Sequence, residues 1–336
     1  MNSTSSTSDQ NSSLASTARC DPTESGTAGN PIRHVGVVGL GHMGEAFARN
    51  LIADGYELTA YDLSEARRDL LASAGARAVS DLAGLAGCEV VLTSLPNDQI
   101  LSDVTLGAGG LVACLAPGAI HISTSTVSPG LARRLSQDHE KAAQGYAAPV
   151  LGNPDLAHAR KLFVITSGKA SSVSRALPLL GRLGQRVFPL GNDPGAANLM
   201  KLAGNVLTAL TLEGMGEVLA LLRKNGIDVH AAFDVLTNSL FDGKVHKTYG
   251  WKIVEEHYSP PGMTAPLAAK DLRLALAEAE HASVPMPVTS LVHDRLVAMI
   301  ARGWSELDWS ALGLLAAAEA GLESVRAPGH SSSDPT

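Results

Sequence analysis

The sequence predicts an α/β protein in which a doubly wound parallel sheet is followed by a domain made only of helices. The run at residues 35–40 is short, rich in valine and free of polar residues, which is typical of a parallel strand buried on both faces. Strand-like and helix-like segments then alternate as far as about Gly191, as in a doubly wound sheet. From Ala196 onward, Gly and Pro breakers separate segments with a helical pattern.

The predicted elements follow one another in a regular order. In the sheet domain we expect strands at 35–40, 89–94, 119–123, 146–150, 162–167 and 186–190, and a further strand that ends at Asp62. Helices are expected from near His42 and at 81–85, 129–144 and 173–183, with a loop from Pro96. A long interdomain helix is expected at 196–223, then helices near 229–238, 249–257, 268–281, 287–302 and 309–320. We therefore divide the chain into a sheet domain (31–193) and a helical substrate and dimerisation domain (194–326), between disordered tails at 1–30 and 327–336.

The composition excludes several classes of protein. The chain has 336 residues, a formal net charge of -7 and 45% hydrophobic residues, and its mean hydropathy is +0.10. The negative charge argues against nucleic acid as a partner, and we expect no membrane span because no uncharged apolar stretch reaches about 18 residues. Three cysteines without C-x-x-C spacing indicate neither disulfides nor a zinc site, so we expect no metal and a cytoplasmic setting.

A glycine motif directly follows the first strand. Gly39, Gly41 and Gly44 form G-x-G-x-x-G, in which the first glycine permits a tight turn, the second lets backbone approach a pyrophosphate and the third lets helix pack on strand. The helix that follows would present free N–H groups to the pyrophosphate. The motif therefore predicts a Rossmann-type dinucleotide site, with cofactor contacts along the turn at Gly39, Leu40, Gly41, His42, Met43 and Gly44.

An acidic residue bears on which dinucleotide is bound. Asp62 ends the second strand about 18 residues after Gly44, where a carboxylate meets the ribose hydroxyls of the adenosine. Because a carboxylate repels a 2′-phosphate, we expect NAD to be preferred. Arg67 and Arg68 follow closely and offer the alternative of a phosphate clamp, so NADP stays possible. The same two arginines are equally compatible with the solvated first turn of a helix.

A dinucleotide motif fixes the cofactor but not the reaction, which depends on groups outside the carboxyl ends of the strands. Two loop segments qualify. Residues 121–129 carry several hydroxyl groups, any of which could instead cap the following helix. Residues 147–153 end a strand in a turn, whose backbone N–H groups suit either a substrate carboxylate or the turn itself.

A third segment lies on the long helix, where Lys201 and Asn205 are four residues apart and share one face. The neighbours of Lys201 in the sequence are apolar, so it is either a surface lysine with a buried stem or a partly desolvated acid. Desolvation lowers the pKa of a lysine toward neutrality, which suits proton donation to the oxyanion formed by hydride addition. The second alternative makes Lys201 a general acid and base.

These motifs, in this order, resemble the β-hydroxyacid dehydrogenase family, which includes 3-hydroxyisobutyrate and 6-phosphogluconate dehydrogenases. The resemblance covers roughly residues 33–322. Residues 125–129 match the family's Ser-Thr-x-x-Pro segment, and residues 148–153 match its Ala-Pro-Val-Ser-Gly-Gly segment in part. Residues 201–205 match Lys-x-x-x-Asn, and residues 270–272 match Lys-Asp-Leu.

The resemblance implies roles for single residues. Lys201 would be the general acid and base, Ser125 and Asn205 would bind polar groups of the substrate, and Lys270 would lie near the nicotinamide. It also implies an NAD(P)-dependent dehydrogenase or reductase of a small carbonyl or hydroxy compound, and a homodimer in which the helical domains pack together. Further expected contacts are Arg67, Leu95, Pro96 and Thr126 for the cofactor, and Val150, Leu151, Gly152, Asn153, Phe241 and Tyr249 for the substrate, although the last two aromatic residues could be core residues instead.

Two departures from the family pattern bear on the substrate. Ser123 stands where the family usually has Asp, and residues 151–153 replace the Ser-Gly-Gly that holds a substrate carboxylate. A less polar ketone or aldehyde therefore fits better than a short 3-hydroxy acid. One alternative is an imine reductase, although those enzymes usually carry Asp or Tyr in place of the lysine. The other is a catalytically silent dinucleotide-binding module, against which Lys201 and Asn205 argue.

Overall fold

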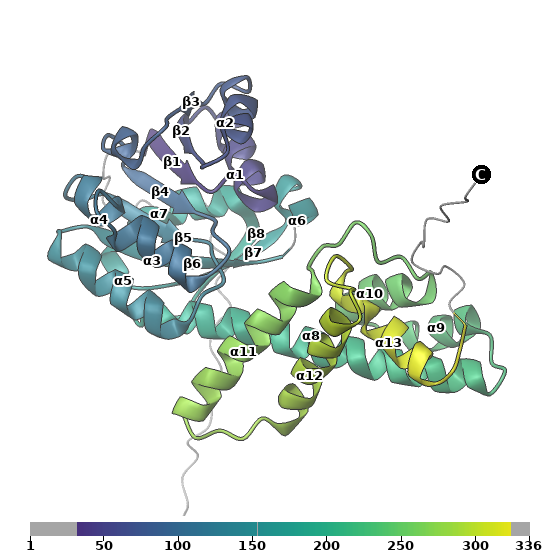
Figure 1. The fold of residues 1–336 in the computed structure, drawn as a ribbon. Coiled ribbons are helices and arrows are strands. Elements are labelled where there is room, and N and C mark those ends of the chain that lie inside the picture. Colours follow the sequence, from purple (N-terminus) through teal and green to yellow (C-terminus); the bar gives the residue numbers. More distant parts are fainter. Residues whose placement is uncertain (1–31, 153, 324–336) are drawn as a thin grey trace, which may run out of the picture. The chain divides into compact units, whose positions relative to one another are not determined.

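The computed structural model describes residues 32–152 and 154–323. Within them, eight strands form one sheet in the order β3-β2-β1-β4-β5-β6-β7-β8 (Figure 1). Neighbouring strands are parallel except β6 and β7, which run antiparallel. The strands are β1 (His34–Val38), β2 (Glu57–Tyr61), β3 (Arg77–Ala78), β4 (Val90–Thr93), β5 (Ile120–Ser123), β6 (Gly145–Leu151), β7 (Leu162–Ser167) and β8 (Gly184–Pro189).

The strand order reverses between β1 and β4. The chain builds outward from β1 to β3, returns, and continues on the other side of β1 through β4 and β5. In open α/β sheets a dinucleotide binds at such a reversal, outside the carboxyl ends of the strands. The fold class predicted from the sequence, a doubly wound sheet followed by helices, is confirmed, and the short strand β3 is an addition to it.

Helices connect the strands, and several of them differ from prediction. They are α1 (His42–Ala53), α2 (Glu65–Ala72), α3 (Asp98–Leu106), α4 (Leu111–Cys114), α5 (Pro129–Lys141), α6 (Pro154–His158) and α7 (Ala170–Leu183). The loop predicted from Pro96 was wrong beyond Asn97, whose side chain accepts the N–H of Ile100 and starts α3. The helix expected at 81–85 is a 3-10 turn (Leu82–Leu85), and α6 was not predicted.

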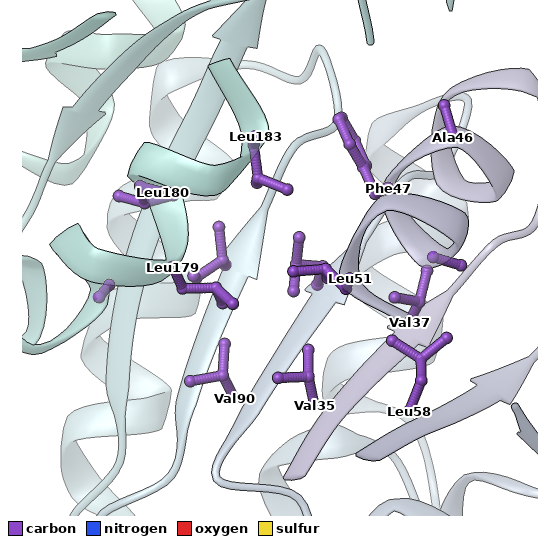
Figure 2. Packing of buried hydrophobic residues seen from close by; sticks show 14 of the residues in the cluster. Val35, Val37, Ala46, Phe47, Leu51, Leu58, Val90, Leu179, Leu180 and Leu183 are labelled. Atoms are coloured by element: carbon purple, nitrogen blue, oxygen red, sulfur yellow. The ribbon is translucent and has the colours of Figure 1, made fainter. Parts of the chain in front are cut away.

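Helices cover both faces of the sheet. On one face, Phe47 and Leu51 of α1 and Leu179 of α7 are fully buried against valines of β1 and β4 (Figure 2). On the other face Leu111 of α4 packs with Val38 of β1 and Val91 of β4, while leucines of α3 and α5 pack with Tyr146 of β6. A sheet buried on both sides explains why β1 and β4 read as continuous apolar runs.

After β8 the described chain is helical apart from connecting turns. The long helix α8 (Pro194–Lys224) begins at a cap in which Asp193 accepts the N–H of Gly195. The remaining helices are α9 (Val229–Thr237), α10 (Lys244–Val254), α11 (Ala265–His281), α12 (Pro287–Ala301), a 3-10 turn (Trp309–Ala311) and α13 (Leu312–Glu319). α11, α12 and α13 contact α8, and Figure 1 shows α11 and α12 crossing it. α10 begins earlier in the sequence than predicted, at Lys244.

The helix α8 is both long and apolar. Its length and mean hydropathy would also suit a membrane-spanning helix. One side of it, including Leu202, Ala209 and Leu212, is nevertheless buried against α11, α12 and α13 in the core of the helical region. A core helix of a folded domain meets the same length and hydropathy criteria, and this packing accounts for the apolar residues on the buried side of α8.

A pair of glycines on α8 tests how closely these helices pack. A Cβ at Gly216 would lie 2.8 Å from the Cα of Gly313 on α13, whereas a Cβ at Gly214 meets nothing within 4 Å. We predict that Gly216→Ala lowers the free energy of unfolding by about 1–3 kcal/mol through overpacking, and that Gly214→Ala leaves it equal or raises it by about 0.5–1 kcal/mol. Urea unfolding of the two variants measures the difference, and equal effects would contradict the packing described.

Candidate dinucleotide-binding and catalytic site

The glycine-rich turn between β1 and α1 is built as its sequence predicts. Gly39 has φ +85, and a Cβ there would lie 2.4 Å from the carbonyl oxygen of Ser94. A Cβ at Gly44 would lie 1.8 Å from the carbonyl oxygen of Gly39, so only glycine allows α1 to approach the turn this closely. Gly41 differs from both, because a Cβ there would meet nothing within 4 Å.

The open space beside Gly41 lies at the start of α1. Gly41 is the N-cap of that helix and provides no side-chain cap, so the first N–H groups of α1 lack intrahelical partners. Unpaired N–H groups and the helix dipole together favour an anion at this end. A backbone that leaves room for a ligand, next to unpaired donors, fits the pyrophosphate of a dinucleotide.

Asp62 is held by the glycine turn. Its Oδ2 accepts the N–H of Leu40 at 2.7 Å, and its Oδ1 accepts the N–H of Ser64 at 2.8 Å. A carboxylate has about four acceptor positions, so these two bonds leave capacity for ribose hydroxyls. Arg67 lies 3.7 Å from the same carboxylate, and Arg68 donates to the main-chain carbonyls of Asp62 and Leu63. The second arginine is thus engaged in closing the loop.

The loops after β4 and β5 are joined to each other by hydrogen bonds. The hydroxyl of Ser125 accepts the N–H of Leu95 at 2.8 Å, and Ser125 is buried. The carboxylate of Asp98 accepts the N–H and hydroxyl of Ser128. Both loops stand at the carboxyl ends of central strands, where a ligand binds in this fold. These contacts fix Ser125, Leu95 and the neighbouring Pro96 and Thr126 relative to one another.

Lys270 of α11 reaches the same two loops. Its ammonium donates to the carbonyl oxygen of Thr126 at 2.8 Å and to that of Pro96 at 3.1 Å. It also lies 3.0 Å from Oδ1 of Asp271. The sequence predicts a cofactor contact for Lys270; its position across the loops after β4 and β5 is compatible with that role and adds a structural one.

Lys201 is buried on α8, with 8% of its surface exposed. Burial lowers its pKa from 10.5 to about 8, the charge of Asp271 acts in the opposite direction, and the charge of Lys270 lowers it further. An ammonium with a pKa near 8 is protonated at neutral pH and gives up its proton more readily than a solvated lysine. Lys201 therefore has the properties of a proton donor, as its apolar surroundings in the sequence indicate.

Asn205 and Asp271 form a pair between α8 and α11. The amide of Asn205 donates to Oδ2 of Asp271 at 2.6 Å, and Asp271 is 2% exposed. No role was predicted for Asp271 from the sequence. It stands on another helix, 66 positions from Asn205, and no spacing rule connects the two. The pair brings a buried negative charge close enough to Lys201 to raise the lysine's pKa against desolvation.

The remaining predicted substrate contacts include residues that the structure does not describe. Asn153 and the side chains of Val150 and Leu151 lie outside the described residues. Gly152 has φ +142 and follows β6. Phe241 is half exposed beside His246, and Tyr249 packs edge-on against Trp309 in the helical core, where burial raises its pKa to about 12.

Comparison with known families divides the chain in two. Residues 34–191 match the NAD binding domain of 6-phosphogluconate dehydrogenase. Residues 195–316 match the family described as the NAD-binding domain of NADP-dependent 3-hydroxyisobutyrate dehydrogenase. The boundary between the matches falls at the loop that joins β8 to α8.

Individual relatives extend over the same part of the chain. The uncharacterized oxidoreductase YfjR of Bacillus subtilis is 37% identical over 281 residues, which are 83% of this chain and 98% of the relative. The NAD-dependent L-serine dehydrogenase of Pseudomonas aeruginosa is 32% identical over 288 residues, 83% of this chain and 96% of the relative.

Solved structures share the fold. The 3-hydroxyisobutyrate dehydrogenase of Mycobacterium tuberculosis with L-serine has a TM-score of 0.77 at 24% identity, covering 84% of this chain and 99% of its own. Psf3 in complex with NADP+ and 2-OPP has a TM-score of 0.76 at 25% identity, with the same coverage. An imine reductase of Myxococcus stipitatus with NAD+ has a TM-score of 0.58 at 19% identity, covering 84% and 98%.

Two glycines of the turn make a matched test of the dinucleotide site. We predict that Gly41→Ala leaves the melting temperature unchanged and weakens dinucleotide binding at least about tenfold, because its Cβ occupies the space of the pyrophosphate. Gly44→Ala should instead lower stability by about 1–3 kcal/mol or more, since its Cβ collides with the Gly39 carbonyl. Calorimetric titration with NAD and thermal melts separate the two effects, and unchanged binding by the Gly41 variant would contradict the site.

Proposed function

The chain belongs to the β-hydroxyacid dehydrogenase family, and we propose that it is a member that prefers NAD and uses Lys201 as its general acid and base. Members of this family are NAD(P)-dependent oxidoreductases, and this chain is one of them. The observation that carries the proposed role is the burial of Lys201, which lowers the pKa of its ammonium to about 8. The proposed substrate is a small carbonyl or hydroxy compound.

The chemistry divides between the cofactor and the chain. A bound dihydronicotinamide supplies the hydride for reduction of a carbonyl carbon. As negative charge develops on the carbonyl oxygen, Lys201 donates a proton to that oxygen, and in the oxidative direction neutral Lys201 takes it back. Among the described residues, the side-chain NH2 of Asn205 donates to Asp271 and the hydroxyl oxygen of Ser125 accepts one N–H, so the carbonyl oxygen of Asn205 and the hydroxyl hydrogen of Ser125 are the groups that would orient polar substituents.

The proton donor is prepared by its surroundings. Without a counter-charge, a fully desolvated lysine would lose its proton at neutral pH and could not act as an acid. Asp271 supplies that counter-charge and is itself anchored by Asn205. The balance leaves Lys201 protonated below a pH of about 8 and ready to release its proton to an oxyanion.

The preference for NAD rests on the position of Asp62. Its carboxylate is fixed to the glycine turn by Leu40, so it cannot turn away from a 2′-phosphate without losing that bond. Arg68 is already engaged with two carbonyls, which leaves Arg67 as the one arginine of the pair near the carboxylate. The NAD-dependent L-serine dehydrogenase supports this choice, whereas the NADP+ complex of Psf3 is the precedent for the alternative.

The substrate class is proposed from the relatives and from one departure. The relatives include dehydrogenases named for small hydroxy acids, among them L-serine and 3-hydroxyisobutyrate. Leu151 stands where the family carries a hydroxyl, so we place a less polar ketone or aldehyde ahead of a short hydroxy acid. Imine reduction is the second candidate; the imine reductase structures share the fold, and Lys201 favours carbonyl chemistry over it.

A homodimer through the helical region is part of the proposal. Large apolar side chains are exposed on α8 and α12, among them Leu207 (65%), Leu221 (61%) and Leu291 (54%). Leu221 and Leu291 line the same hollow between α8 and α12, and exposed apolar surface of this kind marks an interaction site in a soluble protein. Burying these side chains against a second copy would remove that surface from water.

The role of Lys201 is tested by its removal. We predict that Lys201→Met lowers kcat for carbonyl reduction by about 10²- to 10⁴-fold and leaves the Kd for the dinucleotide almost unchanged, since the lysine acts on the reacting oxygen. In the native protein the kcat for reduction should fall as the pH rises through about 8, where the donor loses its proton. Steady-state kinetics between pH 6 and 10 provide both readouts.

A second lysine on the same helix is the control. Lys224→Met, at the other end of α8, should keep the native kcat and pH profile, because the ammonium of Lys224 donates to the carbonyl of Ala320, far along the helix from Lys201. Native kcat in the Lys201 variant would rule out the proposed acid.

Cofactor choice is tested at Asp62. We predict that Asp62→Asn combined with Leu63→Arg shifts the ratio of affinities toward NADP at least about tenfold, because repulsion is removed and a phosphate partner is added. Leu63 is 88% exposed, so an arginine fits there, and Leu63→Arg alone is the matched control. The measurement is the Kd for each dinucleotide. Tighter binding of NADP than of NAD by the native protein would contradict the proposed preference.

A further inference from the structure

Four polar side chains form a buried chain of hydrogen bonds beneath the site. Thr93 of β4 lies 2.9 Å from Nε2 of His121 on β5, and Nδ1 of His121 lies 2.8 Å from Nε2 of His139 on α5. Nδ1 of His139 lies 2.7 Å from Oε1 of Gln144. Thr93 and both histidines are 0% exposed. Two imidazoles buried together are costly unless every polar atom is paired, and here the pairing is continuous.

The direction of these hydrogen bonds follows from the end of the chain. The amide nitrogen of Gln144 donates to the carbonyls of Leu115 and Val112, which can only accept, so Oε1 must face His139. His139 therefore donates from Nδ1, and when it is neutral its Nε2 accepts from His121. His121 in turn accepts at Nε2 from the hydroxyl of Thr93. Neutral rings thus give one unbroken direction, from Thr93 to Gln144.

Both rings are kept neutral by their surroundings. Burial, together with the neighbouring His139, holds the pKa of His121 well below its usual value, and burial lowers the pKa of His139. The titratable groups that face the pair are Tyr146 of β6, whose ring packs against both imidazoles, and Asp138 of α5. Asp98 of α3 acts on Tyr146. None of these groups compensates for the cost of burying a positive charge on either ring.

The buried chain of hydrogen bonds ends at Thr93, next to the start of the loops after β4 and β5. The carbonyl oxygen of Thr93 accepts both the N–H and the hydroxyl of Thr124, each at 2.8 Å. The loop from Ser94 starts directly after Thr93, and Ser125 follows Thr124. These are the loops that Lys270 bridges from the other side. Because the adenosine half of a dinucleotide lies over β2, its nicotinamide half extends over β4 and β5 in this fold.

We propose that His121 and His139 are positioning residues for the nicotinamide half of the site, and that a proton taken up by their hydrogen-bond chain loosens that half. A proton added at Nε2 of His139 forces His121 to accept at Nδ1 and to carry its hydrogen on Nε2. The hydroxyl of Thr93 must then accept instead of donate, and its hydrogen loses its partner. In total one proton is gained, the hydrogen of His121 moves from Nδ1 to Nε2, and no group leaves. The proposal depends on dinucleotide binding and not on the role of Lys201.

The experiment compares NAD+ with ADP-ribose, which contains the adenosine half and the pyrophosphate but no nicotinamide. We measure the Kd of each by calorimetry at pH 7 and pH 5.5, both below the pKa of Lys201. The native protein should lose at least about twofold more affinity for NAD+ than for ADP-ribose on acidification, because the pKa of each ring lies below its usual value. His139→Gln should abolish this difference, because an amide keeps one donor and one acceptor but takes up no proton. His139→Leu should bind NAD+ weakly at both pH values and ADP-ribose normally.

Two results would overturn the proposal. One is a parallel loss of affinity for NAD+ and ADP-ribose, and the other is a native acid response in the folded His139→Gln protein. If that variant fails to fold, ¹⁵N resonances of the imidazoles in the native protein decide instead. We expect two neutral rings at pH 7, each with its hydrogen on Nδ1, and a protonated ring or the opposite tautomer would contradict the chain. Lys201→Met should retain the acid response, which separates this proposal from the proposed function.

Discussion

The burial of one ammonium group, that of Lys201, sets requirements that the surrounding structure meets. Desolvation alone would deprotonate the lysine, and a fully compensating charge would make it a poor acid. Asp271 supplies a partial compensation from α11, and Asn205, one turn after Lys201 on α8, holds Asp271 in place. In the proposed mechanism α8 and α11 must therefore stay in register. Their packing in the helical core then keeps Asp271 beside Lys201 and also stabilises the fold.

The loops after β4 and β5 face this lysine-bearing region and are held from two sides. Lys270 joins their carbonyls from α11, and the buried hydrogen bonds of Thr93 hold their base within the sheet. Arg133 of α5 adds a further connection, because its guanidinium pairs with Asp193 at the start of α8 and with Glu278 of α11. Positioning of this kind lowers the entropic part of an activation barrier, since the reactants need not search for their geometry. In the proposed mode of binding, the glycine turn and Asp62 hold the adenosine half of the cofactor separately.

Features that depend on neighbours in the sequence could be predicted, and features that depend on distant partners could not. The glycine turn, Asp62 and the Lys201–Asn205 face follow local rules of spacing, and the order of strands follows from their alternation with helices. Asp271 and the His121–His139 pair could not be inferred, because their partners lie on other elements and only the fold brings them together. α3 was missed although Asn97 is a good N-cap, because a proline precedes it and suggested a longer loop.

The central claim is that Lys201 titrates near neutrality because it is buried beside Asp271. The most direct measurement is an NMR titration of protein labelled with ¹³C at the lysine ε position, with Lys201→Met used to assign the resonance. We predict that one resonance, absent from the variant, titrates near pH 8, well below the value of about 10.4 that is usual for a solvated lysine. A Lys201 resonance that titrates together with the exposed lysines would contradict the account.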